Sequence, residues 1–516
     1  MTNINICTDK VFDNINKYTQ KFRICQGIFK ILFTNSVKTV IMSVNCLKKY
    51  ERKLTAMATI NSKEEKQHFY KTVIALVIPM ALQNLINVGV QAADVLMLGK
   101  LDEAAISAAS LAGQIYFIMT LLFFGLTSGA AVLTAQYWGK GDTVTIEKVL
   151  GLAMRWAVSI AAVFTAAALI FPVQLMHIFS SEADVIEQGA QYMRIVAIAY
   201  IPAAATMVYL NVMRSVERVI ISTVIYTISL FVNIILNAVF IFGLCGVPAL
   251  GVRGAAIATA IARYCEFFIM IFYAFKVNKT VRIKGKYLAH TEKILVSDFV
   301  KYAVPVAANE LLWGSGISMI TAIIGHLGKS AVAANSVVQV VRQLAMVVIF
   351  GVANATAIML GKAIGEGKKD YAKVYSVRFI KITFLLGLGG ALVVLGVSPI
   401  IKSFMSLGEQ ANDYLSGMMY VMSYFVIASG VNTVLIVGVF RAGGDTKFGL
   451  FLDSGTLWLM AIPLGAVAAF ILKLPVIAVY VILTSDELIK LPFTFTRYKS
   501  FKWLKDVTRD TSEIHD

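Results

Sequence analysis

The residues best suited to chemistry in this sequence lie in an apolar stretch, NLINVGVQAADVLML, which runs from Asn84 to Leu98. It carries one carboxylate, Asp94, which follows the amides Asn84, Asn87 and Gln91. At about 100° per residue of an α-helix, these four side chains fall within roughly 80° of one another. A carboxylate at membrane depth costs about 2.5–3.5 kcal/mol or more, so its presence indicates a functional site.

Candidate partners for this carboxylate lie in two later apolar stretches. In FVNIILNAVF, Asn233 and Asn237 are one helical turn apart on one face. The stretch GVRGAAIATA combines Thr259 with small residues that allow close helix approach. Carboxylate, carbonyl and hydroxyl oxygens suit a hard cation such as Na⁺, and a carboxylate removed from water can carry a proton instead. The residues leave both ions open.

A second group of polar residues follows in the second half of the chain. Glu310 lies five residues after Pro305 in VPVAANELLWGSG, where it would attract a cationic ligand or bond to a neighbouring helix. Further on, Gln339 and Arg342 share a helix face. Arg342 either neutralises Glu310 or admits an anionic group of a ligand.

Other charges in apolar stretches are better explained as structural pairs. Arg263 and Glu266 have the i,i+3 spacing of a helical ion pair. Asp486 and Glu487 precede Lys490 by four and three residues, which also predicts pairing.

Residue types exclude most enzyme chemistry. The five cysteines form no CxxC pair, and the five histidines are scattered without metal-ligand spacing. No His/Asp/Glu or Ser/His cluster falls at one membrane face, as a membrane-embedded transferase or hydrolase would require. We therefore predict a protein that is not an enzyme and holds no structural metal or organic cofactor.

The composition is that of a polytopic membrane protein. Of 516 residues, 58% are hydrophobic and 15% are charged, whereas a soluble domain has about 25% charged residues. Hydrophobic runs long enough to cross a bilayer predict twelve helices: 72–98, 105–135, 149–171, 189–210, 219–243, 254–275, 298–325, 331–361, 374–400, 413–436, 448–471 and 474–496.

The charge distribution predicts the orientation of these spans. The net charge is +17. The loops after even-numbered spans hold 16 Lys/Arg, whereas the loops after odd-numbered spans hold five. The positive-inside rule therefore places both termini in the cytosol. Residues 1–70 contain one apolar stretch, 24–47, which is too interrupted by polar residues to span a membrane. They are expected to form a disordered or surface-associated extension, with Met57 a plausible alternative start.

The two halves of the chain are related to each other. At a constant offset of 226 residues the second half repeats several positions of the first, including Pro79/Pro305, Gly125/Gly351 and Gly139/Gly365. The match falls between spans 1–2 and spans 7–8, and both of these pairs start on the inside, which indicates a parallel six-plus-six repeat. Such repeats are typical of secondary transporters. The domain prediction is a lobe at 71–277, a linker at 278–297, a second lobe at 298–496 and a basic tail at 497–516.

Four quoted stretches together resemble one family: IPMALQNLINVGVQAADVLMLGKLDEAAISAAS, GLTSGAAVLTAQYWGKGD, VNIILNAVFIFGLCGVPALGVRGAAIATAIAR and FRAGGDTK. They are similar to the MATE (multidrug and toxic compound extrusion) transporters over about residues 70–500. The resemblance implies an all-α fold of twelve helices in two six-helix lobes that form a V. It also implies cation-coupled efflux by alternating access.

The resemblance also assigns roles to particular residues. Asp94 falls fifteen residues after Pro79, as in the family's first helix, where the proline allows bending and the aspartate binds the coupling ion. The family's polar residues in the fifth and sixth helices correspond to Asn233, Asn237 and Thr259. Many members have an aspartate where this chain has Asn237.

We therefore expect a cell-membrane antiporter that exports amphipathic, cationic organic compounds in exchange for Na⁺ or H⁺, working as a monomer without nucleic acid. The expected substrate cavity comprises Asn84, Asn87, Gln91, Glu310, Gln339 and Arg342. A flippase for lipid-linked precursors is the alternative function, and it would require more cationic residues in the cavity than Arg342.

Overall fold

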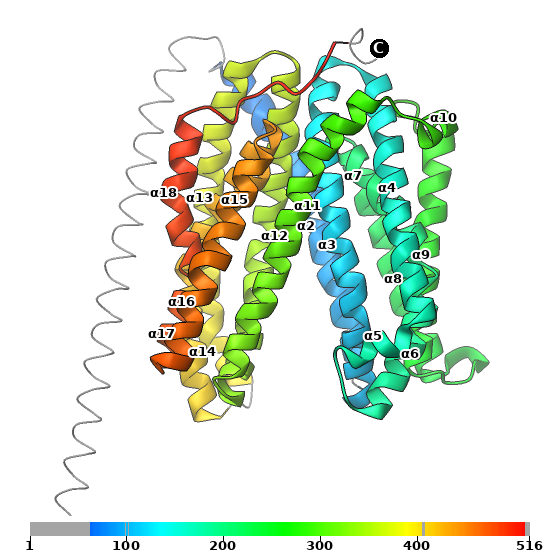
Figure 1. The fold of residues 1–516 in the computed structure, drawn as a ribbon, viewed down its shortest axis with the longest axis vertical. Coiled ribbons are helices and arrows are strands. Elements are labelled where there is room, and N and C mark those ends of the chain that lie inside the picture. The colour runs from blue at the N-terminus through cyan, green and yellow to red at the C-terminus, as the bar shows by residue number, and fades with distance from the viewer. Residues whose placement is uncertain (1–61, 99, 102, 405–407, 511–516) are drawn as a thin grey trace, which may run out of the picture.

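A computed structural model describes residues 62–98, 100–101, 103–404 and 408–510, and their regular secondary structure is entirely helical. The helices form two bundles that meet at one end and diverge toward the other (Figure 1). Most of the predicted N-terminal extension, residues 1–61, lies outside the described residues. Residues 63–70 of that extension form the first two turns of the first described helix.

The N-terminal lobe contains the helices up to residue 277: α2 (Lys63–Leu98), α3 (Glu103–Lys140), α4 (Thr143–Ile170), α5 (Pro172–His177), α6 (Ala183–Ala197), α7 (Tyr200–Ser215), α8 (Ile220–Phe242), η2 (Leu244–Gly246), α9 (Val252–Phe272) and η3 (Tyr273–Val277). A short helix in the linker, α10 (Gly285–Ala289), precedes the second lobe. The C-terminal lobe contains α11 (Lys293–Gly325), α12 (Lys329–Gly365), α13 (Lys369–Phe404), α14 (Glu409–Thr433), η4 (Val434–Phe440), α15 (Thr446–Thr456), η5 (Leu457–Ala461), α16 (Ile462–Ala466), η6 (Val467–Ile471), α17 (Val476–Leu483) and α18 (Asp486–Lys499).

These helices account for the predicted spans with one qualification. Ten helices among the described residues are long and apolar enough to cross a membrane, and α6 with α7, which meet at a 53° bend, count as an eleventh. The twelfth predicted span, 474–496, is the pair α17 and α18, which is interrupted at Thr484 and Ser485. Its second half carries buried charged side chains instead of a continuous apolar run.

The sequence repeat is visible in the packing where the lobes meet. A Cβ atom added to Gly139 would lie 2.1 Å from the carbonyl oxygen of Lys362, and one added to Gly365 would lie 1.9 Å from that of Gln136. Each of these two contacts is the 226-residue counterpart of the other. Glycine is therefore required on both sides, because any side chain would separate α3 from α12. We call this end of the molecule the closed end.

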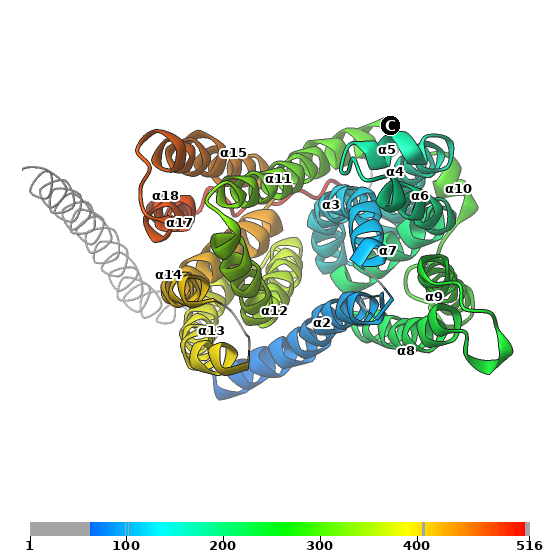
Figure 2. The same ribbon diagram turned by 90° about the horizontal axis from the view of Figure 1, so that it is seen from below.

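Helix α2 and its repeat counterpart α11 are among the helices that pack against both lobes. Helix α2 contacts α8 of its own lobe and α12 of the other, and Figure 2 shows it running between the two bundles. Its counterpart α11 contacts α3 of the first lobe and α15 of its own. The start of α2 reaches α13, where the Phe69 and Phe379 ring centroids are 5.2 Å apart. A movement of α2 therefore alters packing contacts in both lobes.

The linker between the lobes is fixed to the N-terminal lobe. Lys148 and Glu147 of α4 pair with Glu292 and Lys284 of the linker, each at 2.6 Å. The hydrogen bond to Glu147 raises the pKa of the exposed Lys284 ammonium above its usual value. Helix α11 begins at Lys293, five residues before the predicted start of its span, because its first turn lies beyond the apolar run that the prediction followed.

The C-terminal segment 503–510 crosses the closed end, drawn in red in Figure 1. Trp503 is fully buried on the C-terminal lobe. On the N-terminal lobe, the Gln136 side chain donates to the carbonyl oxygens of Ala442 (2.7 Å) and Lys505 (3.1 Å), and accepts from the Val507 amide (2.8 Å). Residues 497–499 of the predicted tail belong to α18, and residues 503–510 form a strap between the lobes.

Candidate functional site

The predicted cation site is assembled from three helices of the N-terminal lobe. The Asn237 amide donates to Asp94 Oδ1 at 2.5 Å and to Asn233 Oδ1 at 3.1 Å. The Asn233 amide in turn donates to Thr259 Oγ1 at 3.4 Å. Helix α9 comes close enough because Gly254 packs on the backbone of α8, where a Cβ would lie 2.4 Å from the Phe240 carbonyl oxygen. The structure thus brings the four predicted residues together.

The electrostatics of this cluster leave one negative charge without a counterion. Asp94 forms no ion pair with any described residue, and the nearby Arg263 is paired with Glu266 at 2.8 Å. The Oδ1 atom of Asn237 is buried and has no hydrogen-bond donor among the described residues. An anionic oxygen and an unused amide oxygen on neighbouring side chains are suited to a cation or a proton.

A small cavity of about 60 Å³ adjoins this cluster, next to Thr259 and Arg263. Three tyrosines complete much of its wall: Tyr116, Tyr192 and Tyr200. The volume exceeds the roughly 10–15 Å³ that one water needs, so hydrated ions have room beside the cluster.

The remaining polar residues of α2 do not share one environment. The Asn84 amide donates to the Val347 carbonyl oxygen of α12 at 3.4 Å, and Asn84 lines a cavity of the other lobe. Asn87 is exposed and lines none of the three described cavities. The Gln91 side chain lies outside the described residues. The predicted stripe therefore divides, because α2 passes from one lobe to the other.

Pro79 sits inside α2, which remains helical through it. The Thr223 hydroxyl of α8 donates to the Pro79 carbonyl oxygen at 3.0 Å. Because proline lacks the N–H group of a normal helix bond, this position is the weakest in α2 and is suited to bending.

The C-terminal lobe holds a much larger cavity of about 520 Å³. This volume lies in the range of small-molecule sites, about 300–1,000 Å³. Aromatic and methionine side chains form much of its wall, including Trp313, Phe350, Phe425, Met346 and Met422. Among the predicted cavity residues, Asn84, Glu310, Gln339 and Arg342 line it.

Glu310 is neutralised, but by a residue other than Arg342. Its carboxylate pairs with Arg441 at 2.6 Å, and Arg441 also donates to Ser128 of α3 at 2.9 Å. The proposed pairing of Arg342 with Glu310 was therefore wrong. The sequence placed Arg441 in a loop, whereas the helical continuation through η4 carries it to the cavity.

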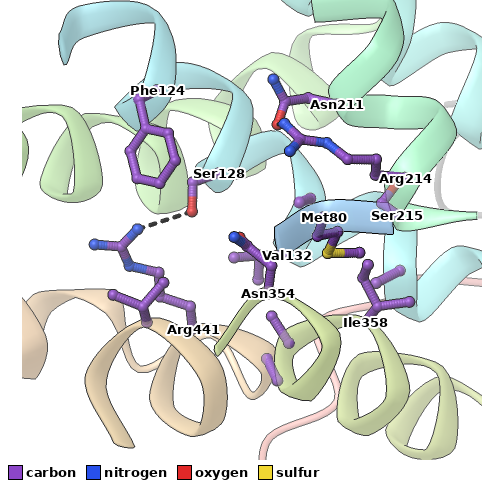
Figure 3. A pocket seen from close by; sticks show the side chains of 15 residues that line it. Met80, Phe124, Ser128, Val132, Asn211, Arg214, Ser215, Asn354, Ile358 and Arg441 are labelled. Atoms are coloured by element: carbon purple, nitrogen blue, oxygen red, sulfur yellow. Dashed lines mark hydrogen bonds between the residues drawn. The ribbon is translucent and has the colours of Figure 1, made fainter. Parts of the chain in front are cut away.

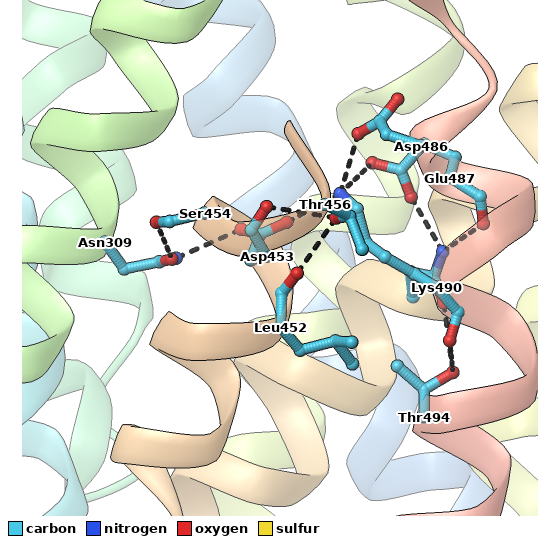
Figure 4. A network of polar contacts seen from close by, with 10 residues as sticks. Asn309, Leu452, Asp453, Ser454, Thr456, Asp486, Glu487, Lys490 and Thr494 are labelled. Atoms are coloured by element: carbon cyan, nitrogen blue, oxygen red, sulfur yellow. Dashed lines mark hydrogen bonds and ion pairs between the residues drawn. The ribbon is translucent and has the colours of Figure 1, made fainter. Parts of the chain in front are cut away.

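A buried ion network forms another wall of this cavity (Figure 4). Lys490 is 1% exposed and contacts Asp453 at 2.6 Å, Asp486 at 2.9 Å and Glu487 at 2.9 Å. The predicted pairing within α18 is confirmed. Asp453 was missed, although a carboxylate in the apolar run GLFLDSGTLWLM meets the same criterion that identified Asp94.

Amides extend this network to neighbouring helices. Asn309 of α11 donates to Asp453 at 3.1 Å and accepts from Ser454 at 3.2 Å. Asn432 of α14 donates to Glu487 at 2.8 Å and accepts from Thr494 at 3.2 Å. The network therefore joins α11, α14, α15 and α18 within one lobe.

A third cavity, of about 40 Å³, lies between the lobes near the closed end (Figure 3). Arg441 reaches it from the C-terminal lobe and Arg214 from the N-terminal lobe. Arg214 donates to the Asn211 side chain and forms no ion pair with any described residue. The space admits a few waters but no organic molecule.

Comparison with known proteins finds sequence matches that cover both lobes. The family model described as MatE matches residues 79–239 and 305–467, one match in each lobe. The probable multidrug resistance protein NorM of Bradyrhizobium diazoefficiens is 26% identical over 421 residues, covering 79% of this chain and 88% of that protein. The probable multidrug resistance protein YoeA of Bacillus subtilis is 24% identical over 463 residues, covering 87% and 98%.

Solved structures share the fold. One is a MOP superfamily transporter from Pyrococcus furiosus, reported to have a binding pocket of reverse polarity. It superposes with a TM-score of 0.77 at 18% identity, and the match covers 83% of this chain and 95% of that one. A MATE structure in a bent conformation has a TM-score of 0.77 at 18% identity, covering 84% and 95%.

Proposed function

The chain belongs to the MatE family, and from that premise we propose that it is a cation-coupled antiporter exporting amphipathic, cationic organic compounds. The multidrug resistance names of its relatives support export of organic compounds. The cavity of about 520 Å³ supports a substrate of drug size, since aromatic and methionine walls adapt to varied apolar surfaces.

Asp94 is the coupling carboxylate in this proposal. The observation that carries it is a membrane-embedded carboxylate with an amide partner, no counterion among the described residues, and a neighbouring unused amide oxygen on Asn237. Binding of Na⁺ or H⁺ removes the negative charge that Asn237 now stabilises. Helix α2 then rearranges at Pro79 and, because it packs on α8 and α12, alters both lobes.

The positive-inside rule puts the closed end at the cytosol, because it carries the loops rich in Lys and Arg. The lobes then diverge toward the outside, and the cation enters the site from that side. Exchange follows if the cation and the substrate favour different arrangements of the lobes. One chain contains both lobes and all three cavities, which supports action as a monomer.

The lipid-precursor flippase receives less support. Such a substrate carries phosphate groups and calls for a cationic cavity. The charged residues lining the large cavity are two arginines and four carboxylates: Arg342, Arg441, Glu310, Asp453, Asp486 and Glu487. This balance favours a substrate with a positive charge.

The test is dye efflux by purified protein in proteoliposomes, with Na⁺ and pH gradients imposed separately. We expect one gradient to drive efflux of a cationic dye by the wild type. Asp94→Asn should lower that efflux at least about 100-fold, because the amide cannot be charged or discharged by the coupling ion. Its thermal stability should remain close to that of the wild type.

Asp370→Asn is the matched control. Asp370 is an exposed residue of α13 paired only with Lys373 at 2.8 Å, so the same chemical change should leave efflux unaltered. Gradient-driven efflux that survives in Asp94→Asn contradicts the coupling assignment. Wild-type protein that moves a labelled lipid but no organic cation contradicts the exporter.

A further inference from the structure

Arg342 differs from the other charged residues that line the large cavity, because no described carboxylate contacts it directly, although Asp486 and Glu487 lie close enough to act on it electrostatically. Arg441 there is paired with Glu310, and the other three lining carboxylates contact Lys490. Arg342 forms no ion pair with any described residue. A guanidinium in the membrane without a carboxylate is costly, so its presence calls for a function.

The Arg342 side chain is held in place by a chain of amides along α12. Its Nε group donates to Gln339 Oε1 at 2.8 Å, and the Gln339 amide donates to Asn335 Oδ1 at 3.4 Å. These bonds use one edge of the guanidinium and leave its two terminal amino groups for another acceptor. Arg342 is thus oriented by its own helix and not by a counterion.

A second unused donor lines the same cavity. Tyr480 of α17 is 1% exposed, and its hydroxyl group has no hydrogen-bond partner among the described residues. A buried hydroxyl group without a hydrogen-bond partner is unfavourable, because nothing replaces the water that it has lost. The cavity therefore presents a fixed guanidinium and an unsatisfied hydroxyl, both of which donate to oxygen anions.

We propose that Arg342 and Tyr480 form a subsite for an oxyanion of the transported molecule, a carboxylate or a phosphate. Since this subsite belongs to the proposed substrate cavity, the inference rests on the proposed function and specifies its substrate. The molecule combines a positive charge, which the surplus of carboxylates around Lys490 favours, with an anionic group on Arg342. An amphoteric compound is then held more tightly than a purely cationic one.

A structural role for Arg342 makes a different prediction. If Arg342 only balanced the excess negative charge around Lys490, its loss would weaken all substrates alike, whatever groups they carry. If it binds an oxyanion, its loss affects only ligands that have one. Two ligands that differ in this group alone separate these roles.

The experiment uses the full-length protein in lipid nanodiscs and a xanthene dye in two forms, the cationic methyl ester and the corresponding free acid. Dissociation constants are measured by fluorescence anisotropy, which needs no transport. We expect wild type to bind the free acid more tightly than the ester. Arg342→Gln should raise the dissociation constant of the free acid about tenfold or more, because a bidentate charge-assisted contact is lost. The dissociation constant of the ester should change by less than about twofold.

Two further variants refine the result. Tyr480→Phe removes only the hydroxyl group. It should raise the dissociation constant of the free acid about threefold to tenfold and leave that of the ester unchanged. Arg253→Gln makes the same change as Arg342→Gln at an exposed position of α9 and should alter neither dye. Unchanged ester binding in Arg342→Gln also shows that the variant is folded.

The source of the oxyanion is decided by a competition arm. A soluble aromatic carboxylate that displaces the free acid, where a short-chain phospholipid does not, identifies a solute as the ligand, and the reverse result identifies a lipid phosphate. Equal weakening of both dyes by Arg342→Gln, or no preference for the acid in wild type, overturns the subsite. Failure of the proposed export is a separate result, since it appears as absent gradient-driven efflux of the ester.

Discussion

In the N-terminal lobe Asp94 has an amide for a partner, whereas in the C-terminal lobe Lys490 contacts three carboxylates. The two lobes are repeats, yet the residue equivalent to Asp94 is Ile320, which lines the large cavity. A lone carboxylate can gain or lose one cation with few other contacts disturbed. A four-residue ion network that joins several helices supports the lobe itself. The same scaffold thus carries a lone carboxylate in one lobe and an ion network that joins helices in the other.

Two arginines that line the cavity between the lobes show the same division. Arg441 is fixed between Glu310 and Ser128, whereas Arg214 of the other lobe contacts the Asn211 side chain and forms no ion pair with any described residue. In the C-terminal lobe each carboxylate that lines the large cavity contacts a cationic side chain, whereas Arg342 forms no ion pair with any described residue. In the N-terminal lobe, Asp94 and Arg214 form no ion pair with any described residue, and amide side chains are their hydrogen-bond partners.

Breaking the C-terminal network should give the largest change in stability. Lys490→Met leaves the buried Asp486 and Glu487 and the partly buried Asp453 without their cation, and we expect a loss of about 3–5 kcal/mol in the free energy of unfolding. Asp94→Asn should cost less than about 1 kcal/mol, since it removes no ion pair. Thermal unfolding in detergent, followed by tryptophan fluorescence, measures both.

Lys499→Met supplies the reference for that comparison. Lys499 is exposed on the same helix, α18, so its loss should not alter the unfolding temperature. If Lys490→Met were no less stable than Lys499→Met, the network would not support the lobe.

A double variant tests whether the loss comes from unpaired carboxylates. Adding Asp453→Asn to Lys490→Met removes one of the unpaired carboxylates. The double variant should therefore recover about 1–3 kcal/mol of unfolding free energy relative to Lys490→Met alone. Asp453→Asn alone should be destabilising, because Lys490 and Asn309 both lose their strongest contact. Additive effects of the two substitutions would contradict a direct interaction.

Making the N-terminal site more acidic should sharpen the difference between the lobes. Asn237→Asp places a second carboxylate beside Asp94, and we expect about a tenfold gain in apparent affinity for the coupling ion, since affinity rises with ligand charge. The measurement is the concentration of Na⁺ or H⁺ that gives half-maximal efflux. An unchanged value would place the coupling ion elsewhere.

The smallest effect is expected where an arginine keeps its main partner. Ser128→Ala removes one hydrogen bond to Arg441 but leaves the ion pair with Glu310, so the cost should be about 0.5–1.5 kcal/mol. Efflux should continue near the wild-type rate. A loss comparable to that of Lys490→Met would show that Arg441 depends on the N-terminal lobe.

Helical periodicity and the repeat predicted the fold and the N-terminal cluster well, because each depends on spacing along single helices. Asp94, Asn233 and Asn237 could be placed on faces without knowledge of their neighbours. The partner of Glu310 could not, since Arg441 lies 131 positions away and reaches it only through the packing of η4. The sequence also did not predict that Asn84 and Asp94 of α2 lie in different environments. Spacing within a helix does not reveal that its two ends contact different lobes.

The strap at the closed end has a consequence for biogenesis. Residues 503–510 follow every described helix in the chain, so they leave the ribosome after the spans on both sides of the cavities. The hydrogen bonds from the Gln136 side chain to the backbone of Lys505 and Val507, which join the strap to the first lobe, form only after this segment has been synthesised. The closed end therefore gains these hydrogen bonds between the lobes only after every described helix has been synthesised.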